Sequence, residues 1–300
     1  MSWTRLMVVL AVVGCGSGGG LAPTSVASPW VTQALEKEPD VVVSVDIAAL
    51  RRDPFFGKLV DLVMADAPLP YDAVRGARRI DLFGTVQASR LRSAFTAIVY
   101  GAGALTPELQ QCIERDTNEH VSVSAVNDRW VVSSGQPTGT APDAIHMDSD
   151  ALFEAWLGPG AVDAGLARAR WDVQDLLWRH LYALRMRIEG GGTPGLVVDA
   201  HFETSVDAEH AVYDFARVKR ALEGAVEAIR DEELAKQMIE QLPNFHVARS
   251  GADVRVDFHL TPGLTQYVSK LLDRDPPRRV RDRCSLSTHR DGAIRSAPVE

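Results

Sequence analysis

The 300-residue sequence has only three cysteines, Cys15, Cys112 and Cys284, and no excess of positive charge. So few cysteines exclude a disulfide-dense small domain, and they form neither a CxxC pair nor a zinc-type cluster. With 40 acidic residues against 32 Lys and Arg, the formal net charge is 32 − 40 = −8. An acidic chain lacks the basic surface that a general nucleic-acid-binding protein needs, so we expect no nucleic acid partner.

Long hydrophobic runs are missing as well. The apolar run near the N-terminus, residues 6–14, would form a helix of about 14 Å, roughly half the thickness of a hydrocarbon core. It is therefore too short to span a bilayer. A charged start with Arg5, a short apolar segment and small residues at its end are typical of a secretory signal.

The end of this leader carries the most specific motif in the chain. Val12-Val13-Gly14-Cys15 resembles the lipobox of bacterial lipoproteins, in which an aliphatic and two small or slim residues precede a cysteine. The resemblance covers the leader alone. It implies cleavage before Cys15, diacylglycerol on the Cys15 sulfur and a further acyl chain on the new amino group. The alternatives are an ordinary secretory signal with a chance cysteine, or an N-terminus that is not cleaved.

A lipid on Cys15 would make the membrane the first partner of this protein, since several acyl chains together anchor a protein almost permanently. Gly16 to Gly20 are Gly and Ser only, which is the composition of a flexible tether. Because residue 16 is not Asp, the family rule for a Gram-negative cell implies the periplasmic face of the outer membrane. The sequence leaves inner and outer membrane open.

Composition and periodicity divide the chain into five segments. They are a lipoprotein signal peptide at 1–14, the lipidated Cys15 with a tether at 15–35, a first α+β lobe at 36–158, a second α+β lobe at 159–272, and a disordered Arg-rich tail at 273–300.

Alternating or β-rich runs predict strands, and 3.6-residue periodicity predicts helices. The expected strands are residues 41–47, 80–86, 94–100, 121–126, 130–133, 184–188, 198–202, 245–248 and 254–260. The expected helices are residues 55–64, 106–115, 150–157, 171–182, 207–229, 234–239 and 261–272. Short helices between hairpins favour an α+β fold, with antiparallel sheets and helices packed on one face.

The two lobes share a short string. Leu105-Thr106-Pro107 recurs as Leu260-Thr261-Pro262, an offset of 155 residues. At the same offset Val41-Val42-Val43 matches Leu196-Val197-Val198, so two related βαββα repeats are one interpretation and a chance match the other. In outline the body resembles the uncharacterised duplicated α+β lipoproteins of high-GC envelope bacteria. That resemblance implies no functional motif.

Candidate chemistry is sparse. Asp199, His201 and Glu203 share one face of a predicted strand, and Arg255, Asp257 and His259 share a face of another. His201, Glu203, Asp257 and His259 are the weak candidates for a metal or catalytic site, because imidazole and carboxylate groups bind divalent metals. The opposite faces are apolar, which favours a solvated, mixed-charge ladder that Arg185, Arg187 and Glu189 would extend.

The remaining motifs indicate a function less specifically. Tyr100 to Thr106 resembles a GxGxxG dinucleotide turn, but Thr106 replaces the third glycine and Pro107 removes an amide. Cys112 is expected to be buried as a small hydrophobe, with a bond to Cys284 as the alternative. The sequence contains no GxSxG, HExxH or SxxK string, so we predict no catalytic residue, no resident metal and no cofactor.

These observations predict a membrane-anchored cell-envelope lipoprotein that acts as a non-enzymatic binding or scaffold module, with an envelope protein as a further partner. An envelope hydrolase or metal enzyme, and a carrier of an apolar ligand, are the alternatives. The sequence does not predict the oligomeric state.

Overall fold

The computed structural model describes residues 39–65, 76–87, 92–107, 109–111, 121–126, 129–134, 151–162, 180–191, 193–226 and 229–274. The signal peptide, Cys15, Cys112, Cys284 and residues 275–300 lie outside this set, so the predictions about them stay predictions. Asp273 and Arg274, the first two residues of the expected tail, complete the last helix.

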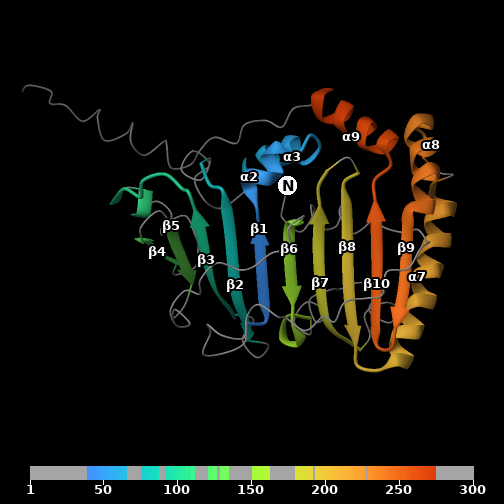
Figure 1. Ribbon diagram of the computed structural model, residues 1–300, viewed down its shortest axis with the longest axis horizontal. Helices are drawn as coiled ribbons and strands as arrows, with labels where there is room; N and C mark the ends of the chain where they lie inside the picture. Colours follow the sequence, from blue (N-terminus) through green and yellow to red (C-terminus); the bar gives the residue numbers. More distant parts are fainter. Residues whose placement is uncertain are drawn as a thin grey trace, which may run out of the picture.

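The described strands form one sheet in which every neighbouring pair is antiparallel (Figure 1). Its order is β4-β5-β3-β2-β1-β6-β7-β8-β10-β9. The strands are β1 Val41–Val45, β2 Arg79–Gln87, β3 Arg92–Tyr100, β4 Val121–Val126, β5 Arg129–Ser134, β6 Ala151–Leu157, β7 Leu181–Glu189, β8 Gly195–Phe202, β9 Phe245–Ser250 and β10 Asp253–His259. With the helices below, this confirms the α+β class.

The helices begin where side chains cap their backbone amides. The Asp46 carboxylate accepts from Ala49 N at 2.7 Å, and the Asp231 carboxylate accepts from Leu234 N at 2.9 Å. Thr261 Oγ1 likewise accepts from Leu264 N at 3.2 Å. The described helices are α2 Ile47–Arg52, α3 Phe56–Ala65, α7 Ser205–Val226, α8 Glu232–Gln241 and α9 Pro262–Arg274, with a 3₁₀ turn η2 at Leu242–Asn244.

The register of the sheet separates an apolar face from a polar face, because directly paired antiparallel residues point to the same side. On the apolar face one row of paired residues runs across all ten strands: Val123, Val132, Ala97, Leu82, Val43, Ala155, Met186, Val198, Val256 and Val247. The adjacent row on the polar face is Ser124, Val131, Ile98, Asp81, Ser44, Glu154, Arg187, Val197, Asp257 and His246.

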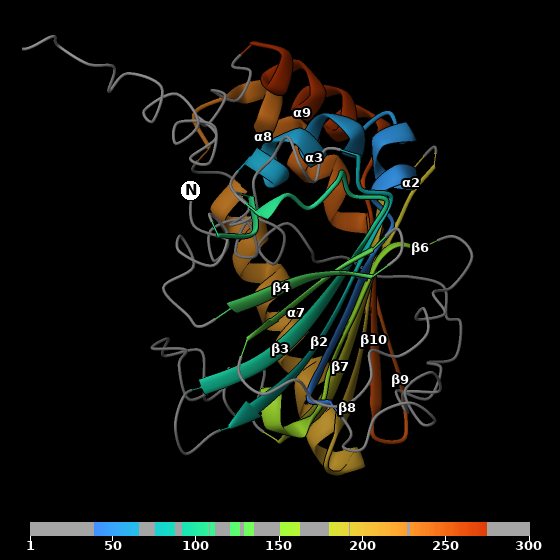
Figure 2. The same cartoon turned by 90° about the vertical axis from the view of Figure 1, so that its left-hand side faces the viewer.

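Two of the four apolar clusters of the described residues bury most of the apolar face. Ala208 and Ala211 of α7 pack with Phe202 and Phe258 in one cluster. Ile47 of α2 and Val60 of α3 pack with strand residues such as Val99 in the other. A third cluster, of Val42, Phe83, Ile98, Trp156 and Ala183, lies on the polar face, and a smaller one surrounds Phe55, Phe56 and Leu152. Seen along the sheet, α7 runs beside the strands while α2, α3, α8 and α9 gather towards one end (Figure 2).

The two predicted lobes share this single sheet. β6 is the last strand of the first predicted lobe, whose expected end is Gly158. It pairs with β7, the first strand of the second lobe, and the pairs run from Phe153 opposite Ile188 to Leu157 opposite Leu184. The strands of the two lobes therefore form a continuous hydrogen-bonded layer, with one apolar cluster mainly in each lobe.

The helix expected at residues 150–157 is wrong, because Ala151–Leu157 is strand β6. This segment is apolar apart from Glu154 and lies in the middle of the sheet, where both faces of a strand are buried. Alternation therefore does not distinguish it from a buried helix. The helix expected at 171–182 falls mostly outside the described residues, but its last two residues, Leu181 and Tyr182, begin β7.

The proposed repeat agrees with the structure in element order but not in strand order. Strand, helices and two strands follow one another as β1, α2 and α3, β2, β3, and again as β8, α7 and α8, β9, β10. In the sheet, however, the first set is ordered β1-β2-β3 and the second β8-β10-β9. The second half therefore does not reproduce the topology of the first.

Candidate functional site

The polar face of the sheet carries a charge ladder, the largest grouping of ionisable residues among the sequence candidates. It consists of Arg79, Asp81, Glu154, Arg185, Arg187, Asp199, Arg255 and Asp257. Four arginines and four carboxylates give a formal charge of 4 − 4 = 0. The ladder is therefore electrically neutral as a whole.

The prediction that Asp199, Arg255 and Arg185 face solvent is wrong, whereas Glu203 of the same predicted set is exposed. Arg79, Asp81 and Glu154 are not part of that prediction. Asp81 is 0% exposed, Glu154 and Asp199 are each 1% exposed, and Arg185 and Arg255 are also buried. Ion pairing explains how so many charges tolerate burial, since a buried charge is costly unless it is paired. The sequence pattern placed Arg185, Asp199 and Arg255 on the correct face but did not predict their burial, and it predicted a helix around Glu154.

At one end of the ladder, β1, β2 and β3 bring together a hydroxyl, a carboxylate and a guanidinium. Ser44 Oγ donates to Asp81 Oδ1 at 2.5 Å, and Arg79 Nε donates to the same oxygen at 2.8 Å. The Arg79 guanidinium carbon lies 6.0 Å from the centre of the Tyr100 ring, and that of Arg129 lies 5.8 Å from it. Burial, followed by the charge of Asp81, raises the pKa of Tyr100, so its hydroxyl stays protonated at neutral pH.

In the middle of the sheet, Glu154 on β6 pairs with Arg185 on β7. Arg185 Nε donates to Glu154 Oε1 at 2.5 Å, and a second guanidinium nitrogen contacts the same oxygen. Both side chains are buried, so this pair lies in a low-dielectric environment in which losing one partner leaves an uncompensated charge.

The last part of the ladder joins β8 and β10. Arg255 Nη1 lies 3.8 Å from Asp199 Oδ1, while Arg255 Nε donates to Asp257 Oδ1 at 3.0 Å. Neither carboxylate oxygen of Asp199 has a hydrogen-bond partner in the described part of the chain. Burial therefore raises the pKa of Asp199, against the opposing charges of Arg255, Arg187 and Arg185.

The four weak candidates for a metal or catalytic site do not converge. His201 Nδ1 lies 2.7 Å from Asp253 Oδ1, and Glu203 Oε2 lies 3.1 Å from His180 Nδ1. In the sheet, His201 lies opposite Asp253, and His259 lies six residues further along β10 than Asp253. At strand spacing, His201 and His259 are therefore roughly 20 Å apart. In the residues that the structure describes, no three His, Cys, Asp or Glu side chains are placed to hold a metal ion.

The glycine-containing turn after β3 contacts neighbouring parts of the chain. Gly101 has a φ of 71°, and a Cβ there would lie 2.8 Å from Arg78 Nε. Gly103 O accepts a hydrogen bond from Trp130 Nε1 at 2.8 Å. The backbone conformation accounts for Gly101, and the Gly103 carbonyl ties the turn to Trp130 on β5.

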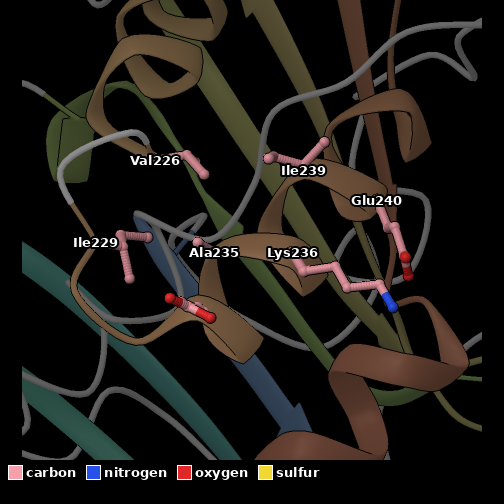
Figure 3. A pocket seen from close by; sticks show the side chains of 7 residues that line it. Val226, Ile229, Ala235, Lys236, Ile239 and Glu240 are labelled. Carbon is pink, nitrogen blue, oxygen red and sulfur yellow. The ribbon is translucent and has the colours of Figure 1, made fainter.

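A groove between the end of α7 and α8 lies outside every sequence candidate. It encloses about 420 Å³ and is open to solvent, with a mainly aliphatic lining. Figure 3 shows Val226, Ile229 and Ile239 around it, with Lys236 and Glu240 from α8 at its border. Ile239 is 58% exposed. The periodicity of α7 and α8 predicted both helices, but the shared groove depends on how they pack.

No family model and no curated protein matches this chain. Among solved structures, crystal form I of TP0453 aligns with 84% of this chain and 98% of its own, at 9% identity and a TM-score of 0.37. A similarity of this degree does not carry a function from one protein to the other. Within the described residues, no helix is long and apolar enough to cross a membrane.

Proposed function

We propose that this protein is a lipoprotein of the bacterial cell envelope, held to the membrane by acyl chains on Cys15. Its α+β body would act as a non-enzymatic binding or scaffold module. The observation that carries the proposal is Val12-Val13-Gly14-Cys15 at the end of a short apolar run, followed by a Gly and Ser tether. The described body begins at residue 39. We infer that the Gly and Ser segment after Cys15 serves as its tether, because such a composition is typical of linkers.

The arrangement of the polar side chains supports a scaffold rather than an enzyme. The charged groups of the ladder bond to one another, within a strand as Arg255 does with Asp257, or between strands as Glu154 does with Arg185. A catalytic group must instead reach a substrate within hydrogen-bond distance. Of the two histidines among the candidates, His201 bonds to Asp253, and His259 lies at the other end of β10.

Processing of the full chain in a Gram-negative host tests the anchor. We expect an inhibitor of the lipoprotein signal peptidase to make the full-length precursor accumulate. We also expect Cys15→Ala to abolish acylation. The matched control is Cys112→Ala, which should be processed and acylated like the wild type. Unchanged electrophoretic mobility with the inhibitor, together with normal maturation of Cys15→Ala, would contradict the proposal.

A screen of the purified full chain tests the binding module. Thermal unfolding would be followed with divalent metals, nucleotides, phospholipids and peptidoglycan fragments, since a ligand that binds the folded state raises the unfolding temperature. We expect an envelope component to stabilise the protein. Turnover of any envelope substrate by the purified chain would instead favour the hydrolase alternative.

The groove favours a second candidate function, a carrier of an acyl chain. Its lining is mainly aliphatic, and the Lys236 ammonium at its border could pair with a carboxylate or phosphate head group. A fluorescent long-chain fatty acid would then bind the wild type but not Ile239→Asp. Val206→Asp is a matched control, because Val206 is 59% exposed near the start of α7, outside the groove lining. Absence of binding to the wild type would reject this function.

A further inference from the structure

The two edges of the sheet differ in how their backbones are protected. Edge strand β9 carries Arg249 next to its last residue. Arg249 Nη1 donates to Ser205 O at 3.1 Å, and its Nη2 lies 3.5 Å from Glu209 Oε2. These contacts tie the edge to the start of α7, which runs beside it (Figure 1). A charged residue and a covering helix are two devices by which proteins prevent further strand pairing.

Edge strand β4 carries no charged residue, and within the described residues no covering helix lies over it. Its sequence, VSVSAV, contains no charge, no proline and no glycine. Within the described residues β4 pairs with β5 alone, so alternate N–H and C=O groups along its outer side have no backbone partner there. Ser122, Ser124 and Ala125 are exposed. An uncharged, exposed edge of this kind is a template for another strand.

We propose that β4 is a homodimerisation edge, at which the β4 strands of two copies of this chain pair antiparallel about a two-fold axis. Pairing centred on Val123 places Val123 opposite its own copy, Ser122 opposite Ser124 of the second copy, and Val121 opposite Ala125 of the second copy. Val121 to Ala125 then pair like with like, and Val126 lies opposite His120 of the second copy. No charge meets a like charge. The self-complementarity of this strand is the reason to choose a second copy over an unrelated peptide.

The two faces of the joined sheet would also be continuous. Val121 and Val123 are buried in the cluster with Trp130, on the apolar face of their own subunit. In the register centred on Val123, the apolar faces of both copies lie on the same side, and the exposed serines meet on the other. Since these valines are already buried, pairing would add mainly main-chain hydrogen bonds and contacts between the serines.

The interface is small, so we expect a weak dimer. Two six-residue strands bury less than the roughly 1,200 Å² at the lower end of standard interfaces, which corresponds to association in the micromolar range. Confinement of two copies to one membrane would raise their effective concentration and favour the dimer. Measurement in detergent solution separates this inference from the proposed anchor.

Paired charge variants test both the edge and its register. In Ser122→Lys/Ser124→Lys, each lysine would face a lysine of the second copy. In Ser122→Glu/Ser124→Lys, each glutamate would face a lysine. Both variants change the same two exposed residues, and both lose the 2.8 Å contact between Ser122 Oγ and Ser133 Oγ. They therefore differ only in the sign of one charge.

Sedimentation equilibrium of the purified full chain gives the readout. We expect a monomer–dimer equilibrium for the wild type, a dissociation constant at least about tenfold higher for the double lysine variant, and a dimer retained by the glutamate–lysine variant. A wild type that is monomeric up to about 200 µM, well above the micromolar range expected, would overturn the proposal. A dimer that the double lysine variant leaves unchanged would overturn it too. Loss of the dimer in both variants would reject the register centred on Val123.

Discussion

The two faces of the sheet bury their side chains in different ways. The apolar face is covered by helix α7 and by α2 and α3, with valine, leucine and phenylalanine side chains packed together. The central strands of the polar face bury charged side chains as well, each beside a partner of opposite sign, as with Glu154 and Arg185. The comparison teaches that apolar burial stabilises the first face, whereas the second combines an apolar cluster around Val42 and Trp156 with charges that must stay paired.

The largest effect is expected on the apolar face. Phe202 is 1% exposed and lies in the cluster beneath α7, so Phe202→Ala should lower the free energy of unfolding by about 3–5 kcal/mol through lost burial and a cavity. Urea denaturation of the purified chain measures this change. A loss below about 1 kcal/mol would mean that the two faces do not differ as described.

On the polar face, removing one charge should cost more than removing both. Glu154→Leu leaves Arg185 buried without this carboxylate and should destabilise the protein by about 3 kcal/mol. Glu154→Leu/Arg185→Leu should recover most of that loss, because it removes the uncompensated guanidinium. A double variant no more stable than the single one would show that pairing is not what the polar face depends on.

Asp199 gives the polar face a pH dependence that the apolar face lacks. Because its pKa is raised in the folded state, the folded protein keeps a proton that the unfolded chain has lost once pH exceeds the ordinary value of 3.8. This contribution to stability therefore decreases as pH rises from 3.8 through the raised pKa.

Asp199→Asn removes this titration. Its stability relative to the wild type should increase with pH above 3.8 and then become constant, as measured by urea denaturation from pH 4 to pH 8. A stability difference that is flat across this range would contradict the assignment of the raised pKa to Asp199.

The smallest effect is expected for an ion pair that belongs to neither face. Lys58 Nζ lies 2.8 Å from Asp273 Oδ1, but the two side chains are 38% and 65% exposed. Lys58→Ala should change the free energy of unfolding by less than about 1 kcal/mol, and less still at high salt. A larger loss would show that exposed pairs contribute here as buried ones do.

Much of the fold could be predicted from the sequence. The 3.6-residue period from Val212 to Val226 predicts α7, and the Thr-Pro steps predict where helices begin after β3 and β10. Strand β6 could not be predicted, because a strand buried on both faces has no alternation. Its position in the middle of the sheet depends on pairing with β1 and β7, which are distant in the sequence.

The candidate site was predicted less well. Alternation along β8 and β10 placed Asp199 and Arg255 on the face opposite the core, which is correct. Their burial depends on partners such as Arg185 on a neighbouring strand, whose register no local pattern specifies. The groove beside Ile239 also depends on the packing of two helices rather than on either helix alone.

The central claim, a lipid anchor on Cys15, is tested most directly by mass spectrometry of the mature N-terminal peptide from bacterial membranes. We predict a peptide that begins at Cys15 and carries a diacylglycerol thioether with a further acyl chain on its amino group. A peptide that retains Met1 and a free Cys15 thiol would contradict the claim.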